Sequence, residues 1–214
     1  MERTRRLLAG QVVPARSRAF HVAYEGTPSW ETGRSQPVVT GLLAEGAMRG
    51  RILDVGCGTG LHAVALAAAG CDVVGIDLVP RAIELATARA EDAALPVRLV
   101  VADAFQLPSL GDVLGGPFDT ILDVGLFHVL QPWDRAPYAE ALAAVTRPGA
   151  RAYVVAWSDQ NPFGIGPGRI RRRDLRAAFS AGAGWRVERI DAARLETLLP
   201  MGTVHAWLAR LTRR

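Results

Sequence analysis

The segment from Ile52 to Gly60, ILDVGCGTG, constrains the fold of this chain more than any other. An apolar run typical of a strand passes through Asp54 into glycines at alternate positions, Gly56, Gly58 and Gly60. Glycine lacks a Cβ atom and adopts positive φ freely, so the backbone at this turn can approach a ligand closely. The next residues, LHAVALAAAG, place apolar side chains at helical spacing. The segment therefore predicts a strand, a tight glycine turn and a helix, an arrangement typical of a nucleotide cofactor site.

The spacing of the glycines separates two kinds of cofactor. A dinucleotide fingerprint reads G-x-G-x-x-G, but its last position here is Leu61, and the third glycine comes one residue early. A pyrophosphate site is therefore disfavoured. The apolar run VVGID ends in Asp77, 17 positions after Gly60, which is near the spacing at which a carboxylate at the next strand end binds ribose hydroxyls. We predict that Asp77 is the ribose ligand.

The D-x-G-x-G-x-G turn resembles that of class I methyltransferases that use S-adenosylmethionine, and the resemblance extends along nearly the whole chain. It implies that the glycine turn lies against the methionine and ribose parts of the cofactor, where no phosphate needs neutralising. It also implies a seven-stranded sheet whose last strand inserts antiparallel to the rest. Around this turn and the next strand end, the residues assigned to the cofactor are Asp54, Gly56, Cys57, Gly58, Gly60, Asp77 and Leu78.

Length and periodicity predict one domain over residues 1–214. Half of the 214 residues are apolar, enough to bury a sizeable core without a disulfide or metal. Alternating strand and helix patterns predict an α/β, Rossmann-like fold with a mainly parallel sheet and helices on both faces. Beyond the first two strands, we expect strands at 97–102, 118–123, 150–157, 185–190 and 204–211. Helices are expected at 36–48, 134–145 and 171–181, and another opens at Pro80.

Two further strand ends extend the expected cofactor site. The segment VVADAFQLP places Asp103 just beyond the third strand, where its carboxylate can accept from the adenine amino group. The alternative for such an acid is a helix N-cap. The resemblance implies that Ala104 offers a backbone amide to the adenine ring and that Phe105 forms an apolar wall. It also assigns Asp123, at the end of the fourth strand, to the cofactor site.

The residues after the fourth strand favour a small acceptor. Enzymes that methylate exocyclic amines of nucleic-acid bases typically carry Asn-Pro-Pro-Tyr or Asp-Pro-Pro-Tyr there, whereas this chain reads DVGLFHVL from Asp123 to Leu130. The segment resembles DSGLFHVF in bacterial and fungal small-molecule enzymes akin to thiopurine and thiol methyltransferases. Val124 replaces the serine of that pattern.

The same group carries PWDIGRPQP before its glycine turn, where this chain has PSWETGRSQP. The resemblance implies that residues 1–36 form an N-terminal cap over the active site. Trp30 would pack near the methionine end of the cofactor, and Arg34 would be available to its carboxylate. The alternative for Trp30 is an anchor that ties a surface loop to the core.

Methyl transfer from a sulfonium asks mainly that the acceptor be held in line with the methyl group and that water be excluded. His128, just past the fourth strand, is the candidate base or substrate contact because its unperturbed pKa is near 6.5. The alternative is a structural histidine bonded to backbone, and a thiol or acidic phenol that arrives ionised needs no base. His21, His62 and His205 form no metal-ligand spacing with the cysteines, so no metal is expected.

Aromatic residues in segments that can reach the open edge of the sheet predict a pocket suited to a planar or apolar acceptor. The residues assigned to the substrate pocket are Phe20, Tyr24, Phe127, Trp133, Trp157 and Phe163. The loop at 158–168, SDQNPFGIGPG, is rich in glycine and proline and follows a strand end, so it is a candidate substrate lid.

Charge and composition bear on partners. The net charge is +4, every basic residue is arginine, and one dense cluster occurs in GRIRRRDLR. The cluster starts an amphipathic helix, which favours a solvated face over a nucleic-acid site. The basic N-terminus has too short an apolar run for a signal or membrane segment. We therefore expect a cytoplasmic monomer or homodimer without membrane or nucleic-acid partners.

The leading hypothesis is S-adenosylmethionine-dependent methyl transfer to an oxygen, nitrogen or sulfur atom of a small aromatic, heteroaromatic or thiol compound, in secondary metabolism or detoxification. One alternative is an RNA or protein methyltransferase that uses the arginine cluster. Another is a cofactor-binding protein without methylating activity on the same fold.

Overall fold

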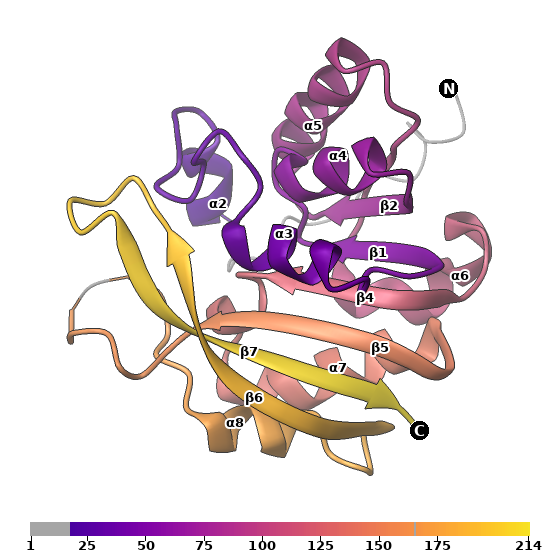
Figure 1. Ribbon diagram of the computed structural model, residues 1–214, viewed down its shortest axis with the longest axis vertical. Coiled ribbons are helices and arrows are strands. Elements are labelled where there is room, and N and C mark those ends of the chain that lie inside the picture. Colours follow the sequence, from indigo (N-terminus) through magenta and orange to yellow (C-terminus); the bar gives the residue numbers. More distant parts are fainter. Residues whose placement is uncertain (1–17, 165) are drawn as a thin grey trace.

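The computed structural model describes residues 18–164 and 166–214. They form a seven-stranded sheet with the order β3-β2-β1-β4-β5-β7-β6 (Figure 1). Five strands are mutually parallel: β1 (Arg51–Val55), β2 (Asp72–Asp77), β3 (Arg98–Val101), β4 (Phe118–Val124) and β5 (Thr146–Trp157). Strand β7 (Thr203–Arg213) pairs antiparallel with both β5 and β6 (Trp185–Glu196). The predicted class I methyltransferase topology, with its antiparallel last strand, is confirmed.

Helices cover both faces of the sheet. The helices α3 (Pro37–Ala44) and α4 (Leu61–Ala68) pack on one face, with α5 (Pro80–Asp92) beside α4, while α6 (Leu107–Leu114), α7 (Arg135–Ala144) and α8 (Arg172–Ala178) pack on the other (Figure 1). Successive strand residues point to opposite faces, so Ile52 joins the core under α3 and α4 whereas Leu53 joins the core under α6 and α7. A further helix, α2 (Arg18–Ala23), lies in the N-terminal segment.

Four elements differ from the sequence expectation. The predicted range 185–190 covers only the first half of β6, whose exposed polar residues hide the strand pattern, and the range 204–211 lies within the slightly longer β7. The two strands form one hairpin. Helix α6 was not predicted, since LPSLGDVL contains a proline and a glycine. Its proline lies in the first turn, where the missing N–H costs nothing. Helix α2 was not predicted either.

The strand order reverses between β1 and β4, whose neighbours β2 and β5 lie on opposite sides. In open α/β sheets, ligands bind in the crevice at the carboxyl ends of the strands at such a switch point. The chain segments after β1 to β5 meet along this edge. In the described part of the chain, no helix is long and apolar enough to cross a membrane.

Candidate active site

A cavity of about 500 Å³ opens at the carboxyl edge of the sheet. This volume lies within the range of small-molecule sites. Its walls come from the segments after the parallel strands, from the N-terminal segment around Trp30, and from the end of the β6–β7 hairpin, which contributes Leu195, Thr197 and Leu199.

The glycine turn lines one end of the cavity. Gly56, Gly58 and Gly60 have φ of 71°, 56° and 78°, values that L side chains rarely adopt. A Cβ on Gly58 would lie 3.0 Å from Tyr24 Oη, and a Cβ on Gly60 would lie 3.0 Å from Ala86 Cβ. Gly56 and Gly58 therefore bring backbone to the cavity wall, whereas Gly60 lets α5 pack against the turn. Cys57 also lies in the wall, and burial raises the pKa of its thiol.

Asp77 bridges the glycine turn and the start of α5. Its carboxylate accepts from the backbone N–H groups of Gly58 and Val79, both at 2.9 Å. Burial raises its pKa, and these backbone hydrogen bonds oppose that rise. Asp77 and Leu78 both lie in the cavity wall. A carboxylate has about four acceptor sites, so the two amides leave capacity for ligand hydroxyls.

The segment after β3 lines the same end. Asp103 caps the short 3-10 helix η2 (Ala104–Gln106) by accepting from the Phe105 N–H at 3.0 Å. The N-cap expected as the alternative for this acid therefore exists. Asp103, Ala104 and Phe105 nevertheless all lie in the cavity wall.

Two predicted cofactor residues lie beneath the cavity rather than in its wall. Asp123 is fully buried and accepts from the N–H groups of Leu126 (2.9 Å) and Phe127 (3.1 Å) and from Tyr138 Oη–H (2.7 Å). It thereby shapes the turn that carries His128. Asp54, also buried, lies below the glycine turn, and its Oδ2 has no hydrogen-bond partner among the described residues.

The buried Asp54 is expected to make the free energy of unfolding depend on pH. Burial, and then the nearby Asp123 and Asp77, raise its pKa to about 8. A carboxyl whose pKa is raised in the folded state stabilises the fold while protonated, and this contribution is lost as pH rises from about 4 to about 8. We expect the free energy of unfolding of the wild type to fall as pH rises from 5 to 8. In Asp54→Asn this fall should be less steep, by up to about 1.4 kcal/mol per pH unit. Urea unfolding at a series of pH values measures the free energy of unfolding. An unchanged pH dependence in Asp54→Asn would contradict the raised pKa of Asp54.

His128 lies in the 3-10 turn η3 (Phe127–Val129) and in the cavity wall. Its Nδ1 accepts from the backbone N–H of Trp157 at 3.0 Å, and burial lowers its pKa to about 4. The neutral ring therefore carries its proton on Nε2. As a result, Nε2 is a donor toward the cavity and has no lone pair for a proton. The backbone bond expected of a structural histidine is therefore present, the predicted role as a base has no support in this geometry, and the predicted substrate contact stays a prediction.

The predicted aromatic residues divide into three groups. Phe20, Tyr24, Trp30 and Trp157 line the cavity. Phe127 does not, because it is fully buried against Phe179, at 5.5 Å between ring centroids, under α7 and α8. Trp133 and Phe163 are 73% and 87% exposed and also lie outside it.

Arg34 is turned away from the cavity. Its guanidinium donates to both carboxylate oxygens of Glu196, at 3.1 and 2.7 Å, and its side chain is 71% exposed. The predicted contact between Arg34 and the cofactor carboxylate therefore has no support in this geometry, because the guanidinium pairs with the carboxylate of Glu196 in the hairpin.

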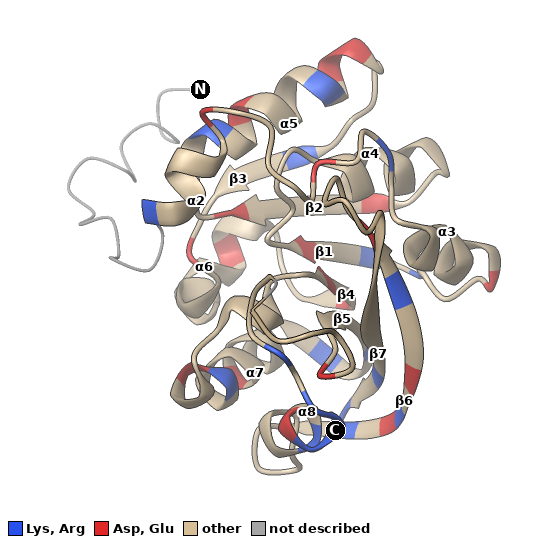
Figure 2. Ribbon diagram, turned by 90° about the vertical axis from the view of Figure 1, so that its left-hand side faces the viewer, with Lys and Arg blue, Asp and Glu red and all other residues tan. Residues whose placement is uncertain are grey.

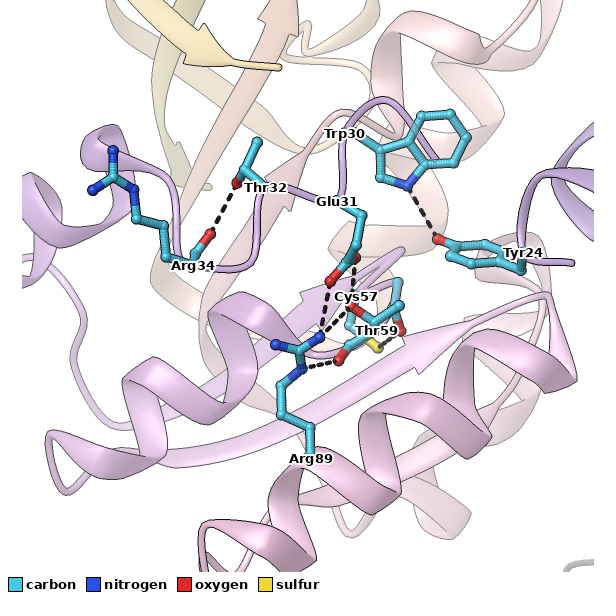
Figure 3. Close-up of polar contacts among 9 residues, drawn as sticks. Tyr24, Trp30, Glu31, Thr32, Arg34, Cys57, Thr59 and Arg89 are labelled. Atoms are coloured by element: carbon cyan, nitrogen blue, oxygen red, sulfur yellow. Dashed lines mark hydrogen bonds and ion pairs between the residues drawn. The ribbon is translucent and has the colours of Figure 1, made fainter. Parts of the chain in front are cut away.

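The N-terminal segment is bound to the glycine turn by a polar network (Figure 3). Glu31 accepts from Thr59 Oγ1 at 2.6 Å and from Arg89 Nη2 at 2.8 Å, while Arg89 Nε donates to the Thr59 carbonyl at 2.9 Å. Beside it, Trp30 Nε1 donates to Tyr24 Oη at 3.3 Å. The N-terminal residues that cover the cavity are thus held in place by hydrogen bonds to the glycine turn that lines it.

The segment is also bound to the hairpin. The Gln36 side chain exchanges two hydrogen bonds with the Glu196 backbone, at 3.0 and 2.8 Å. The Leu198 N–H donates to the Ser29 carbonyl at 2.7 Å. Residues 18–36 therefore form one wall of the cavity; residues 1–17 of the predicted cap lie outside the described part of the chain.

The predicted lid at 158–168 is held at its base. Asn161 Nδ2 donates to the carbonyls of Ser158 (3.0 Å) and His205 (2.7 Å), and its Oδ1 accepts from the His205 N–H at 2.8 Å. Gly166 lies against the Trp157 ring, where a Cβ would approach Cζ2 to 2.6 Å. Gly166 and Pro167 line the cavity, so this end of the loop closes it beside Trp157.

Sequence reasoning missed His62 and Gln36, which both line the cavity. His62 lies in the first turn of α4, and Ser35 Oγ is 3.0 Å from its Nδ1. Its position, directly after the glycine turn, is the signal that could have identified it, because the start of that helix borders the crevice.

Comparison with known proteins agrees with this architecture. A family model described as a methyltransferase domain matches residues 52–149. A 2-heptyl-1-hydroxyquinolin-4(1H)-one methyltransferase of Mycobacteroides abscessus is 34% identical over 172 residues, covering 78% of this chain and 73% of that protein. A solved structure described as "Conversion of a Disulfide Bond into a Thioacetal Group during Echinomycin Biosynthesis" superposes with a TM-score of 0.82 at 31% identity, covering 92% of this chain and 91% of the other.

A magnesium protoporphyrin IX methyltransferase from Synechocystis PCC 6803, solved with bound S-adenosylmethionine, shares the fold at a TM-score of 0.63 and 18% identity, covering 100% of this chain and 90% of that one. The chain belongs to the class I methyltransferases. It is an S-adenosylmethionine-dependent enzyme of the small-molecule type.

Proposed function

We propose that this enzyme methylates an oxygen, nitrogen or sulfur atom on a planar aromatic or heteroaromatic small molecule in secondary metabolism. The observation that carries the proposal is the continuous cavity, which runs from the glycine turn to His62, His128 and Trp157. Its walls are largely apolar, and no arginine is among the described residues that line it. Such a site suits a planar acceptor that carries one polar group and no phosphate.

The cofactor would occupy the end formed by the segments after β1, β2 and β3. There, Asp77 would accept from the ribose hydroxyls, Asp103 and the Ala104 amide would bind adenine, and the glycine turn would approach the methionine part. Bound S-adenosylmethionine supplies an activated methyl group on a sulfonium. The chain itself has to position the acceptor and exclude water.

The acceptor would occupy the other end, between His128, Trp157 and the hairpin residues. The His128 Nε2–H would donate to an oxygen or to the anion of the acceptor. The indole N–H of Trp157 is buried without a partner among the described residues, and an unpaired buried donor is costly unless a ligand satisfies it. The name of the Mycobacteroides abscessus relative specifies a ring system of this kind, with a hydroxyl and a carbonyl oxygen.

A thiol outside a planar ring system is the second candidate. It is favoured by the solved relative associated with conversion of a disulfide into a thioacetal. A thiolate needs no base at neutral pH when its pKa is low, and the donor on His128 would also bind it.

The test is incubation of the full chain with methyl-labelled cofactor and a panel of acceptors. The panel contains 2-heptyl-1-hydroxyquinolin-4(1H)-one, 4-methylphenol, 4-nitrophenol, 4-nitrothiophenol, an alkanethiol, N-heterocycles and bulk RNA. We expect label in one class of planar compound and none in RNA. Label only in RNA would contradict the proposal.

The arginine cluster is the feature on which a nucleic-acid acceptor would depend. It gathers around α8, at the end of the molecule that carries the C-terminus (Figure 2). Arg172 stacks over Trp207 at 4.2 Å, and none of the cluster lines the cavity. We expect replacement of 171–173 by glutamine to leave small-molecule turnover intact. RNA binding with a steep salt dependence that disappears in this variant would favour the alternative.

Asp77 offers a test of the cofactor end. We expect Asp77→Ala to weaken S-adenosylmethionine binding by roughly 1–3 kcal/mol, because ribose hydroxyls would lose a charged acceptor. Since alanine also releases the amides of Gly58 and Val79, which bind the two carboxylate oxygens separately, Asp77→Asn is the matched variant that keeps an acceptor for one of them. Calorimetry measures both. Unchanged affinity in folded variants would remove Asp77 from the site.

A further inference from the structure

His62 and His128 are two histidines in one cavity wall with different hydrogen-bond partners. The partner of His128 Nδ1 is a backbone N–H, which can only donate. The partner of His62 Nδ1 is the hydroxyl of Ser35, at 3.0 Å, which can donate or accept. The two rings therefore differ in the protonation states that they can adopt without losing this hydrogen bond.

For His62, the hydroxyl can accept from Nδ1–H, which leaves a lone pair on Nε2. If Nε2 then gains a proton, the imidazolium keeps the same hydrogen bond. For His128, a proton on Nδ1 would face the Trp157 N–H, so the imidazolium would lose its hydrogen bond. Of these two rings, His62 alone can take up a proton without rearrangement.

The charged groups on the elements around His62 pair with other residues or lie below the glycine turn. In the N-terminal segment, Glu31 binds Arg89 of α5 and Thr59, and Arg34 binds Glu196 of β6. Asp54 of β1, whose pKa is raised to about 8, lies below the turn. Burial lowers the pKa of His62 to about 4. The ring is therefore neutral at neutral pH, as a proton acceptor must be.

We propose that His62 is the proton acceptor of the reaction, with Ser35 as the residue that sets its tautomer. The inference rests on the proposed function. The acceptor heteroatom forms a bond to the methyl carbon while the carbon–sulfur bond breaks with its electron pair staying on sulfur. The proton of the heteroatom passes to His62 Nε2 and later to water. Positive charge leaves the sulfonium as it appears on the imidazole, so the buried net charge is unchanged, which avoids the cost of adding a charge to the cavity.

The first test needs no turnover. Long-range proton–nitrogen NMR of the full chain without ligand distinguishes the two neutral tautomers, with each histidine assigned by its glutamine variant. We expect protonated Nδ1 in His62 and protonated Nε2 in His128. In Ser35→Ala, His62 should shift to protonated Nε2, because the acceptor for Nδ1–H is gone. A wild-type His62 with a protonated Nε2 would overturn the proposal.

The second test compares acceptors of different acidity at pH 8.5. In 4-methylphenol the hydroxyl has a pKa near that of tyrosine, about 10, whereas 4-nitrophenol is ionised at this pH. We expect His62→Gln to lower kcat at least about 100-fold for the protonated acceptor, the contribution typical of a general base, and less than about 3-fold for the ionised one. If the panel yields other acceptors, the same comparison uses a protonated and an ionised member.

The control is His205→Gln, a histidine outside the cavity lining, which should leave both rates unchanged. An equal loss for both acceptors would assign His62 a structural role and overturn the inference while leaving the proposed function standing. If the wild type methylates no member of the panel, the proposed function fails and the inference fails with it. Cofactor affinity in His62→Gln, measured by calorimetry, should match the wild type.

Discussion

Removal of the residues before Pro37 is expected to lower methyl transfer at least about 100-fold while leaving a folded domain. Residues 18–36, the part of this segment that the structure describes, contribute no strand to the sheet. The described part of the segment covers the cavity with Phe20, Tyr24 and Trp30, and the Trp30 ring contacts the other two rings at 5.9 and 6.0 Å between centroids. Without this wall, the cofactor sulfonium and the acceptor would be open to water, and the acceptor would lose one of the surfaces that position it.

Turnover of an acceptor by the truncated chain, with circular dichroism to verify folding, measures this effect. Since truncation also removes Gln36 and its two hydrogen bonds to β6, point variants are the finer test. We expect about a 10-fold loss in Trp30→Ala, the order of the contribution of one packed surface to positioning. Val22→Ala, on the same segment and 64% exposed, is the matched control. A truncated enzyme with the full-length rate would show that the segment is dispensable.

The Asp123→Ala substitution is expected to destabilise the fold by about 3–5 kcal/mol, the range for breaking a buried charged hydrogen-bond network. The carboxylate accepts from two backbone amides and from Tyr138, and all three donors would be left buried without it. Chemical denaturation measures the loss. Its effect should extend to the site, since the turn that Asp123 holds carries His128.

Asp123→Asn and Tyr138→Phe are the matched variants. Asparagine keeps a side-chain oxygen that accepts from the two backbone amides. Phenylalanine removes the Tyr138 hydroxyl together with its hydrogen bond. Each substitution should therefore cost about 1–2 kcal/mol. A loss below about 1 kcal/mol in Asp123→Ala would show that the turn keeps its hydrogen bonds by other means. The family resemblance had assigned Asp123 to the cofactor, whereas the geometry gives it this internal role.

Local patterns were enough to predict the α/β class and the elements around the site, whereas the seven-stranded sheet with its antiparallel last strand was implied by the family resemblance. The apolar run, the alternating glycines and the acid at the next strand end lie within about one strand–helix–strand unit, so their spacing alone implies the turn, the α/β class and the position of Asp77. The same reasoning located the strand ends that carry Asp103 and His128. These features depend on contacts between residues that are close in the sequence, and such contacts have a regular period.

Partners across long sequence separations were decided by the tertiary structure. Arg34 and Glu196 are 162 positions apart, and their ion pair turns away from the cavity an arginine that was expected to bind the cofactor. His62 and Ser35 are 27 positions apart and meet only because the N-terminal segment folds back over the glycine turn. Phe127 was expected in the pocket, but packing of α7 and α8 buries it. In each case, sequence spacing specifies which residues share a strand or helix, whereas the packing of separate segments determines which hydrogen-bonding and apolar groups meet.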